Sequence, residues 1–171
     1  LHHGTAQFVA RLTVLAGREI APGTEAPAVV RLDGAAAVES HDRFILRALS
    51  PVATLGGGRI LDAMPRRWHG REAHVAYLRA LAAGDAAAAC LVLLGERGEG
   101  GVTAGDLAGA GLAEAEMAAT MATLVAGGRA ERLVSGGRQR WFAPGTLETA
   151  RAALARLAAA NAAARPERPF S

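Results

Sequence analysis

Arginines beside glycines, in segments with strand character, are the residues of this chain best suited to chemistry. Gly56, Gly57 and Gly58 form a run just before one of these arginines, and glycine lets a backbone approach another molecule closely. A guanidinium group can present a planar fork of N–H donors to a phosphate. The pattern favours contact with a phosphate-bearing polymer, and the alternative is a solvated face or pairing with Asp42 and Asp62. Four arginines share this setting: Arg11, Arg43, Arg47 and Arg59.

A second group of arginines surrounds the sequence Ser135-Gly136-Gly137, and Trp141 lies beside it. This segment has the sequence of a β-hairpin whose glycines adopt positive φ. We expect either contact with RNA, the ribosome or a neighbouring domain, or a solvated hairpin with Trp141 packed inward. The arginines concerned are Arg129, Arg132, Arg138 and Arg140.

The sequence contains no recognisable catalytic or metal-binding constellation. It has no lysine, so it contains neither a phosphate-loop lysine nor a Schiff-base lysine. His69 and His74 lack the spacing and companion ligands of a zinc site. Cys90 lies in an apolar run, and Ser50 precedes a proline outside any nucleophile motif. We therefore predict no enzyme activity, no metal site and no cofactor in this chain.

Composition limits the size of the protein and the partners that it would bind. The 171 residues are enough for one ordinary domain or two small ones, and the formal net charge is +3. Residues 1–83 hold ten arginines against seven acidic residues, whereas residues 84–171 hold nine of each. A polyanionic partner should therefore prefer the first half. A single cysteine and the absence of a membrane-spanning run favour a cytoplasmic protein, which we expect to be monomeric and to be a piece of a longer chain.

The first half of the chain has the periodicity of antiparallel strands. Strands are expected over 7–16, 26–32, 43–49 and 59–63, with Phe44, Leu46 and Ala48 on the buried face of the third. In this prediction the triple glycine connects the last two strands. The sequence from Met64 to Trp68 then indicates a linker, because Pro65 breaks the strand pattern.

The second half has helical spacing, interrupted by glycines. Helices are expected from Glu72 to Gly84, over 86–97, over a short segment that Thr103 caps and that ends at Ala110-Gly111, over 112–126 and over 145–163. Two short strands over 129–134 and 138–143 complete a winged-helix arrangement. The predicted recognition helix, 112–126, contains Glu114 and Glu116 and no basic residue, which argues against DNA binding in the major groove. The last helix has an apolar stripe formed by Leu147, Ala150, Leu154 and Leu157.

The sequence DRFILRALSPVATLGGGRILD, residues 42–62, resembles the end of the third domain of the selenocysteine-specific translation elongation factor family, SelB. LHHGTA at the start, Arg11-Leu12, and Pro22-Gly23 before AVVRL are similar in order and spacing. The resemblance implies an α+β fold of two domains. These are a partial antiparallel β-barrel like domain III of elongation factor Tu over 1–65 and a winged-helix domain over 85–144, joined by a linker helix over 66–84. Residues 145–171 would form a connecting helix toward a further winged helix.

The same resemblance implies a part of a GTP-dependent factor that delivers selenocysteyl-tRNA to UGA codons. GTP and Mg²⁺ would be held in a separate G domain, and distal winged helices would grip an mRNA hairpin at the ribosome. This chain would supply tRNA contact, through Arg11, Gly57, Gly58 and Arg59, and spacing between the two ends. Two other classes of protein remain open from the residues: a winged-helix transcription regulator and a structural protein-interaction module.

Overall fold

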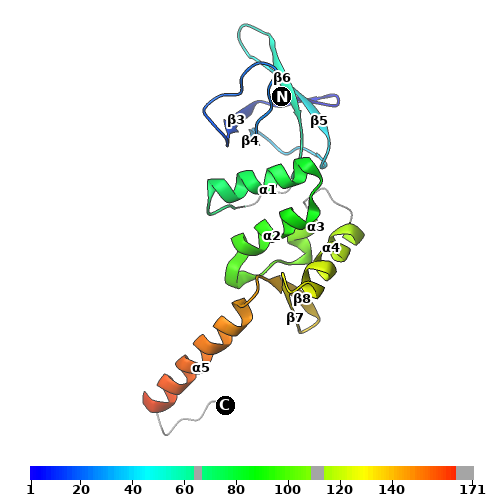
Figure 1. Cartoon of the computed structure of the whole chain (residues 1–171). Helices are drawn as coiled ribbons and strands as arrows, with labels where there is room; N and C mark the ends of the chain where they lie inside the picture. Colours follow the sequence, from blue (N-terminus) through cyan, green and yellow to red (C-terminus); the bar gives the residue numbers. More distant parts are fainter. Residues whose placement is uncertain (64–66, 109–113, 165–171) are drawn as a thin grey trace.

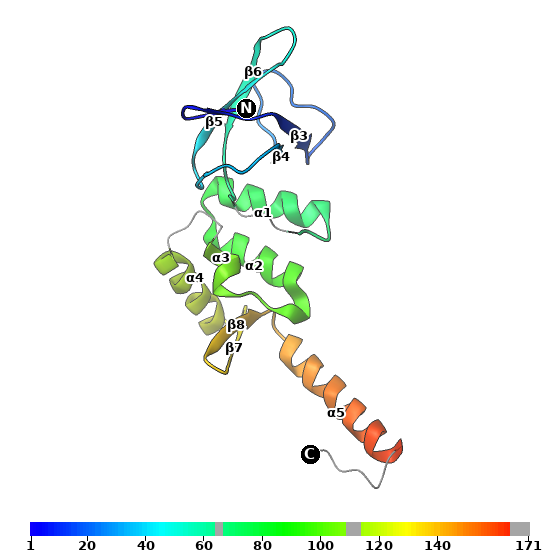
Figure 2. The same cartoon turned by 180° about the vertical axis from the view of Figure 1, so that it is seen from behind.

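The computed structural model describes residues 1–63, 67–108 and 114–164. A β region lies at one end, a helical unit in the middle, and a long helix projects from the other end (Figures 1 and 2). This arrangement is α+β, as predicted. The predicted strand break at Pro65, the helix end at Ala110-Gly111, the helix start at Leu112 and the tail 165–171 lie outside the described residues.

The β region consists of two antiparallel sheets. One has the strand order β2-β1-β5-β6, formed by β1 (His2–His3), β2 (Ala6–Gln7), β5 (Arg43–Arg47) and β6 (Thr54–Arg59). The other pairs β3 (Ala10–Val14) with β4 (Ala28–Leu32). Side chains along β5 alternate between exposed and half-buried, because successive residues of a strand point to opposite faces.

The position of the triple glycine differs from the prediction. We expected a connection there and a strand over 59–63, but β6 contains all three glycines and ends at Arg59. Strand pairing explains the difference. The backbone of β5 supplies hydrogen-bonding partners to the glycines, which join it in extended conformation. The register places Phe44, Ile45 and Leu46 opposite Gly58, Gly57 and Gly56. The low strand propensity of glycine is therefore overridden by a neighbouring strand.

Two of these glycines are required by packing within the sheet. A Cβ on Gly58 would lie 2.5 Å from Cζ of the Phe44 ring, and a Cβ on Gly57 would lie 2.6 Å from the Phe44 carbonyl oxygen. The Phe44 ring therefore covers the inner side of Gly58. Glycine is therefore needed at position 58 because the Phe44 ring occupies the space that a Cβ would fill.

The helical unit begins with α1 (Arg71–Ala83) and α2 (Ala86–Arg97). Gly84 ends α1 in the left-handed region at φ 71°, as the sequence predicts. Asp85 then caps α2 by accepting a hydrogen bond from the Ala88 N–H at 2.9 Å. A 3-10 turn, η1 (Gly98–Gly100), leads through Val102 to α3 (Ala104–Ala108) and α4 (Glu114–Ala126).

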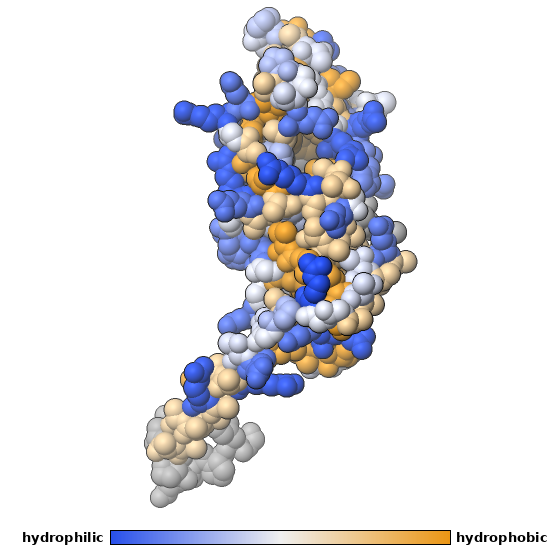
Figure 3. Space-filling model, viewed as in Figure 1, coloured by the Kyte–Doolittle hydropathy of each residue, from blue (hydrophilic) through white to orange (hydrophobic). Residues whose placement is uncertain are grey.

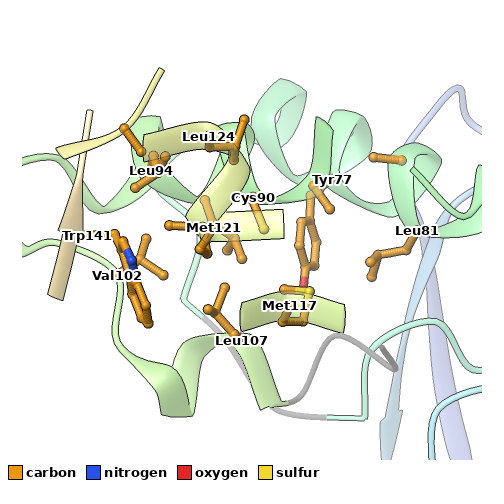
Figure 4. Packing of buried hydrophobic residues seen from close by; sticks show 14 of the residues in the cluster. Tyr77, Leu81, Cys90, Leu94, Val102, Leu107, Met117, Met121, Leu124 and Trp141 are labelled. Atoms are coloured by element: carbon orange, nitrogen blue, oxygen red, sulfur yellow. The ribbon is translucent and has the colours of Figure 1, made fainter. Parts of the chain in front are cut away.

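One hydrophobic core holds these helices together. Figure 4 shows side chains of α1, α2, α3 and α4 gathered in one interior, where Tyr77, Cys90 and Met121 are fully buried. Helix α1 supplies Tyr77, Leu78, Ala80 and Leu81 to the same cluster as α2 and α4. The predicted boundary between residues 84 and 85 stays a prediction, although α1 is packed inside the helical core.

The wing and the last helix follow. Strands β7 (Glu131–Ser135) and β8 (Arg138–Phe142) are joined by Gly136 and Gly137, with φ 55° and 72°, the positive values of a two-residue hairpin turn. Trp141 is 7% exposed, so it packs inward. Helix α5 (Thr146–Ala164) projects from the unit, and Leu154 and Leu157 of its predicted apolar stripe are 66% and 67% exposed.

A capping box starts α3. The Thr103 hydroxyl accepts a hydrogen bond from the Asp106 N–H at 3.2 Å, and Asp106 Oδ2 accepts one from the Thr103 N–H at 2.9 Å. Arg97 of α2 donates to Asp106 Oδ1 at 2.5 Å. Burial opposes ionisation of Asp106, but the Thr103 hydrogen bonds and the nearby Arg97 charge outweigh it and hold the pKa of this carboxyl below its usual value.

We predict that Asp106→Asn lowers the free energy of unfolding at neutral pH by about 1–2 kcal/mol, because it removes a cap and an ion pair. The pKa is lower in the folded state than in the unfolded state. The stabilisation is therefore present above the unfolded value, about 3.9, and is lost as pH falls through the folded value. Urea unfolding of both proteins at neutral pH and near pH 3 measures this. The two curves should converge in acid, while Asp33→Asn, at an exposed carboxylate, should change little at either pH.

We also predict opposite effects of the same substitution at two glycines. Gly58→Ala should destabilise the protein, because the new Cβ meets the Phe44 ring. Gly95→Ala should stabilise it by up to about 1 kcal/mol, because Gly95 lies inside α2 with open space around it and alanine favours helix. Thermal unfolding compares the two variants. Equal melting temperatures for Gly58→Ala and the parent would contradict the packing described for β5 and β6.

Candidate RNA-contacting surface

Strand pairing places two arginines opposite each other across β5 and β6. Arg43 is the register partner of Arg59, and both side chains are exposed. Residues directly opposite in an antiparallel pair project to the same face, and like charges there repel. A pair of this kind is stabilised by an anion between or above the two guanidinium groups. The arrangement is therefore suited to a phosphate.

The residues next to this pair continue the same face of the sheet. Ile45 is 52% exposed, with Gly57 opposite it on β6 and His2 opposite it on β1. Arg47 is two residues beyond Ile45 on the same strand and is also exposed. We call Arg43, Ile45, Arg47, Gly57 and Arg59 the arginine face. Because Gly57 has no side chain, a polymer can lie close to the backbone there, with arginines on both sides.

A second arginine pair lies on the other sheet. Arg11 of β3 is the register partner of Arg31 of β4, and both are exposed. Since β3 and β4 form a separate sheet, strand pairing does not join Arg11 to the predicted Gly57, Gly58 and Arg59. The sequence analysis did not select Arg31, for which the only available signal was its place in the strand AVVRL. That Arg31 lies opposite Arg11 follows from the pairing of β3 with β4, which the sequence does not reveal.

These arginines are available to a partner. Among the described residues, no ion pair or side-chain hydrogen bond is made by Arg11, Arg31, Arg43 or Arg47. Hydrophilic residues, blue in Figure 3, project from the β region on both sides of the view.

The acidic residue next to Arg43 is engaged elsewhere. Asp42 Oδ2 accepts hydrogen bonds from the Glu39 N–H at 2.9 Å and lies 2.9 Å from His3 Nε2. The bond from Glu39 is the main cause that lowers the pKa of Asp42. Asp42 therefore pairs with His3 and the Glu39 N–H, and it does not pair with Arg43.

Within the described residues, the Arg59 side chain makes one hydrogen bond, in which its guanidinium Nη2 donates to the Ala82 carbonyl oxygen at 3.4 Å. This bond is long and exposed, and it engages one of the five N–H donors of the guanidinium. Gly57 and Gly58 are exposed along with it.

The wing arginines do not share one face. Arg138 and Arg140 project on the same side of β8, whereas Arg132 lies opposite Trp141 on the other side, and Arg129 precedes β7. Arg140 also donates to the Gly100 carbonyl oxygen at 2.6 Å. The predicted RNA or ribosome contact of the wing stays a prediction.

Other reactive groups are unsuited to catalysis. Burial raises the pKa of the Cys90 thiol to about 11, so it is neutral and shielded at physiological pH. His74 stacks on Trp68 at 4.7 Å between ring centroids, and burial lowers its pKa. Within residues 1–63, 67–108 and 114–164 there is no group of three or more metal-ligating side chains and no helix able to cross a bilayer.

Comparisons with known proteins agree with the resemblance seen in the sequence. Residues 1–67 match the family model of the β-barrel domain of selenocysteine-specific elongation factors. The selenocysteine-specific elongation factor of Desulfomicrobium baculatum is 31% identical over 106 residues, which are 62% of this chain and 17% of that relative. No solved structure matches the chain. These two matches support a piece of a selenocysteine-specific translation elongation factor, with residues 1–67 similar to the β-barrel domain of that family.

Proposed function

We propose that the β region contacts selenocysteyl-tRNA through the arginine face. The observation that carries this proposal is the exposed Arg43–Arg59 pair beside Gly57, with no acidic side chain bound to either arginine among the described residues. Arg11 and Arg31 would offer a second contact on the adjacent sheet. The wing-bearing unit would space this contact from parts of the factor that bind mRNA.

The chemistry of the arginine face suits the RNA backbone better than it suits bases. Guanidinium forks match the geometry of phosphate oxygens, and Gly57, which lies opposite Ile45, has no side chain to keep a backbone away. Double-helical RNA is recognised mainly by its shape, its phosphates and its 2′-hydroxyls. Binding of this kind is strongly dependent on salt, because each neutralised phosphate releases counterions.

The remaining roles follow from the family and are part of the proposal. GTP and Mg²⁺ would be bound by a separate G domain, and this chain, which contains no lysine, would not hydrolyse GTP by itself. The ribosome and an mRNA hairpin would be partners of the complete factor. We place the protein in the cytoplasm and expect it to act as a monomer.

Helix α4 opposes the rival function of a DNA-binding regulator. It carries no basic residue and exposes Glu116, so it would be repelled by the phosphates that flank a major groove. A structural protein-interaction module would show no salt-dependent binding of nucleic acid at all. These two functions are outcomes of the experiment below.

We predict that Arg43→Ala weakens binding of a selenocysteine tRNA transcript by about 5–10-fold, since one charge-assisted contact is lost. The slope of log affinity against log salt should also fall by about 0.7–0.9, which is one phosphate contact. Filter binding between about 50 and 200 mM salt measures both quantities. Arg79→Ala is the matched control, because Arg79 is an exposed arginine of α1 and its loss changes the net charge equally.

An equal loss in both variants would contradict the proposal, because only net charge would then matter. Preference for duplex DNA over tRNA, with sensitivity confined to Arg138→Ala and Arg140→Ala, would favour the DNA-binding rival. The absence of salt-dependent binding to tRNA and to duplex DNA would favour the protein-interaction module.

A further inference from the structure

Helix α1 moves with the wing-bearing unit, because its buried side is part of the helical core. Tyr77 is fully buried, and Leu78 and Leu81 are each 6% exposed in the cluster that α2 and α4 share. Separating α1 from α2 would expose these side chains to water, which is unfavourable because the apolar surface that they bury would be hydrated again. Any contact between α1 and the β region therefore connects the two parts of the molecule.

The first such contact is at the N-terminal end of α1. The Arg71 guanidinium donates three hydrogen bonds to carbonyl oxygens at and after the end of β3: Nε to Leu15 at 2.5 Å, and Nη2 to Val14 at 2.8 Å and to Gly17 at 3.2 Å. Leu15 and Leu61 also pack against the helical core. A planar fork that reaches three carbonyls fixes both distance and orientation.

The second contact is at the opposite end of the same helix. Arg59, the last residue of β6, donates to the carbonyl oxygen of Ala82 in the last turn of α1. Carbonyls of the last helical turn lack partners within the helix and carry the negative end of its dipole, so they attract a cation. The bond is 3.4 Å long and exposed, which makes it the weaker of the two contacts.

We infer that α1 is a bridge of fixed angle between the arginine face and the wing, held firmly by Arg71 and releasably by Arg59. Two contacts at opposite ends of a 13-residue helix prevent it from turning about either one. The release step rests on the proposed function, because it needs RNA at Arg59. A phosphate forms a stronger bond with a guanidinium than a backbone carbonyl does at 3.4 Å, so bound RNA would draw Arg59 away from Ala82.

The consequence is that RNA contact and wing orientation are linked. With Arg59 withdrawn, α1 stays attached at Arg71 and can pivot there, carrying the wing with it. By reciprocity, a ligand that favours the pivoted wing would strengthen RNA binding at the arginine face by the same factor. Arg59 would thus link RNA binding at one end of α1 to the pivoting of α1 about Arg71 at the other end.

Distance measurements by electron–electron resonance between spin labels test the bridge. Labels at Thr13→Cys on β3 and Gln139→Cys on β8 report the angle, and buried Cys90 is protected from labelling. Without RNA, the parent should give a single narrow distance peak. Arg71→Ala should lose that peak, Arg71→Lys should lose it in part because one ammonium cannot span three carbonyls, and Arg79→Ala should keep it.

RNA then tests the release step. Adding the selenocysteine tRNA transcript should broaden the parent distribution, and Arg59→Ala should be broadened already and should not change further. A parent peak retained in Arg71→Ala, with circular dichroism confirming that this variant is folded, would overturn the bridge. An equal response to RNA in the parent and in Arg59→Ala would overturn the release. Failure of the tRNA to bind at all would remove the proposed function and the release together, while the RNA-free comparison still decides the bridge.

Discussion

Repulsion between arginines that face each other across neighbouring strands is the constraint on which the proposed function of this β region depends. Arg43 with Arg59, and Arg11 with Arg31, hold like charges opposite each other in two separate sheets. Exposure to water lowers the energetic cost of each pair, but nothing in the described residues neutralises Arg43, Arg11 or Arg31. A phosphate would convert the repulsion into attraction, so under the proposed function the residues that repel each other in the free sheet would favour an RNA-bound one.

Packing behind the sheet supports this surface and ties it to the helices. The Phe44 ring occupies the place of a side chain at position 58, so β6 can carry glycine without leaving a void. At the other sheet, Arg71 binds three carbonyls at and after the end of β3, and α1 buries Tyr77 in the helical core. The arginine face and the wing therefore belong to one connected structure, in which Arg59 takes part in both the surface and the connection.

Local features were predictable from the sequence, whereas features set by pairing were not. Alternation along β5, the stop at Gly84, the Thr103 cap and the Gly136-Gly137 turn each depend on neighbouring residues, and the structure confirms them. Three features escaped prediction because each is set by a distant segment: glycines forming β6, Arg31 facing Arg11, and Arg71 reaching β3. The apolar stripe of α5 is exposed at Leu154 and Leu157, because a helical pattern reveals which side of a helix is apolar but not whether another segment covers that side.

Hydrogen–deuterium exchange with and without a selenocysteine tRNA transcript tests the central claim most directly, because it shows which backbone the RNA covers. The account predicts slower exchange over residues 43–47 and 54–59, with α4 unchanged. Slower exchange confined to residues 131–142, with β5 and β6 exchanging as in the free protein, would contradict it.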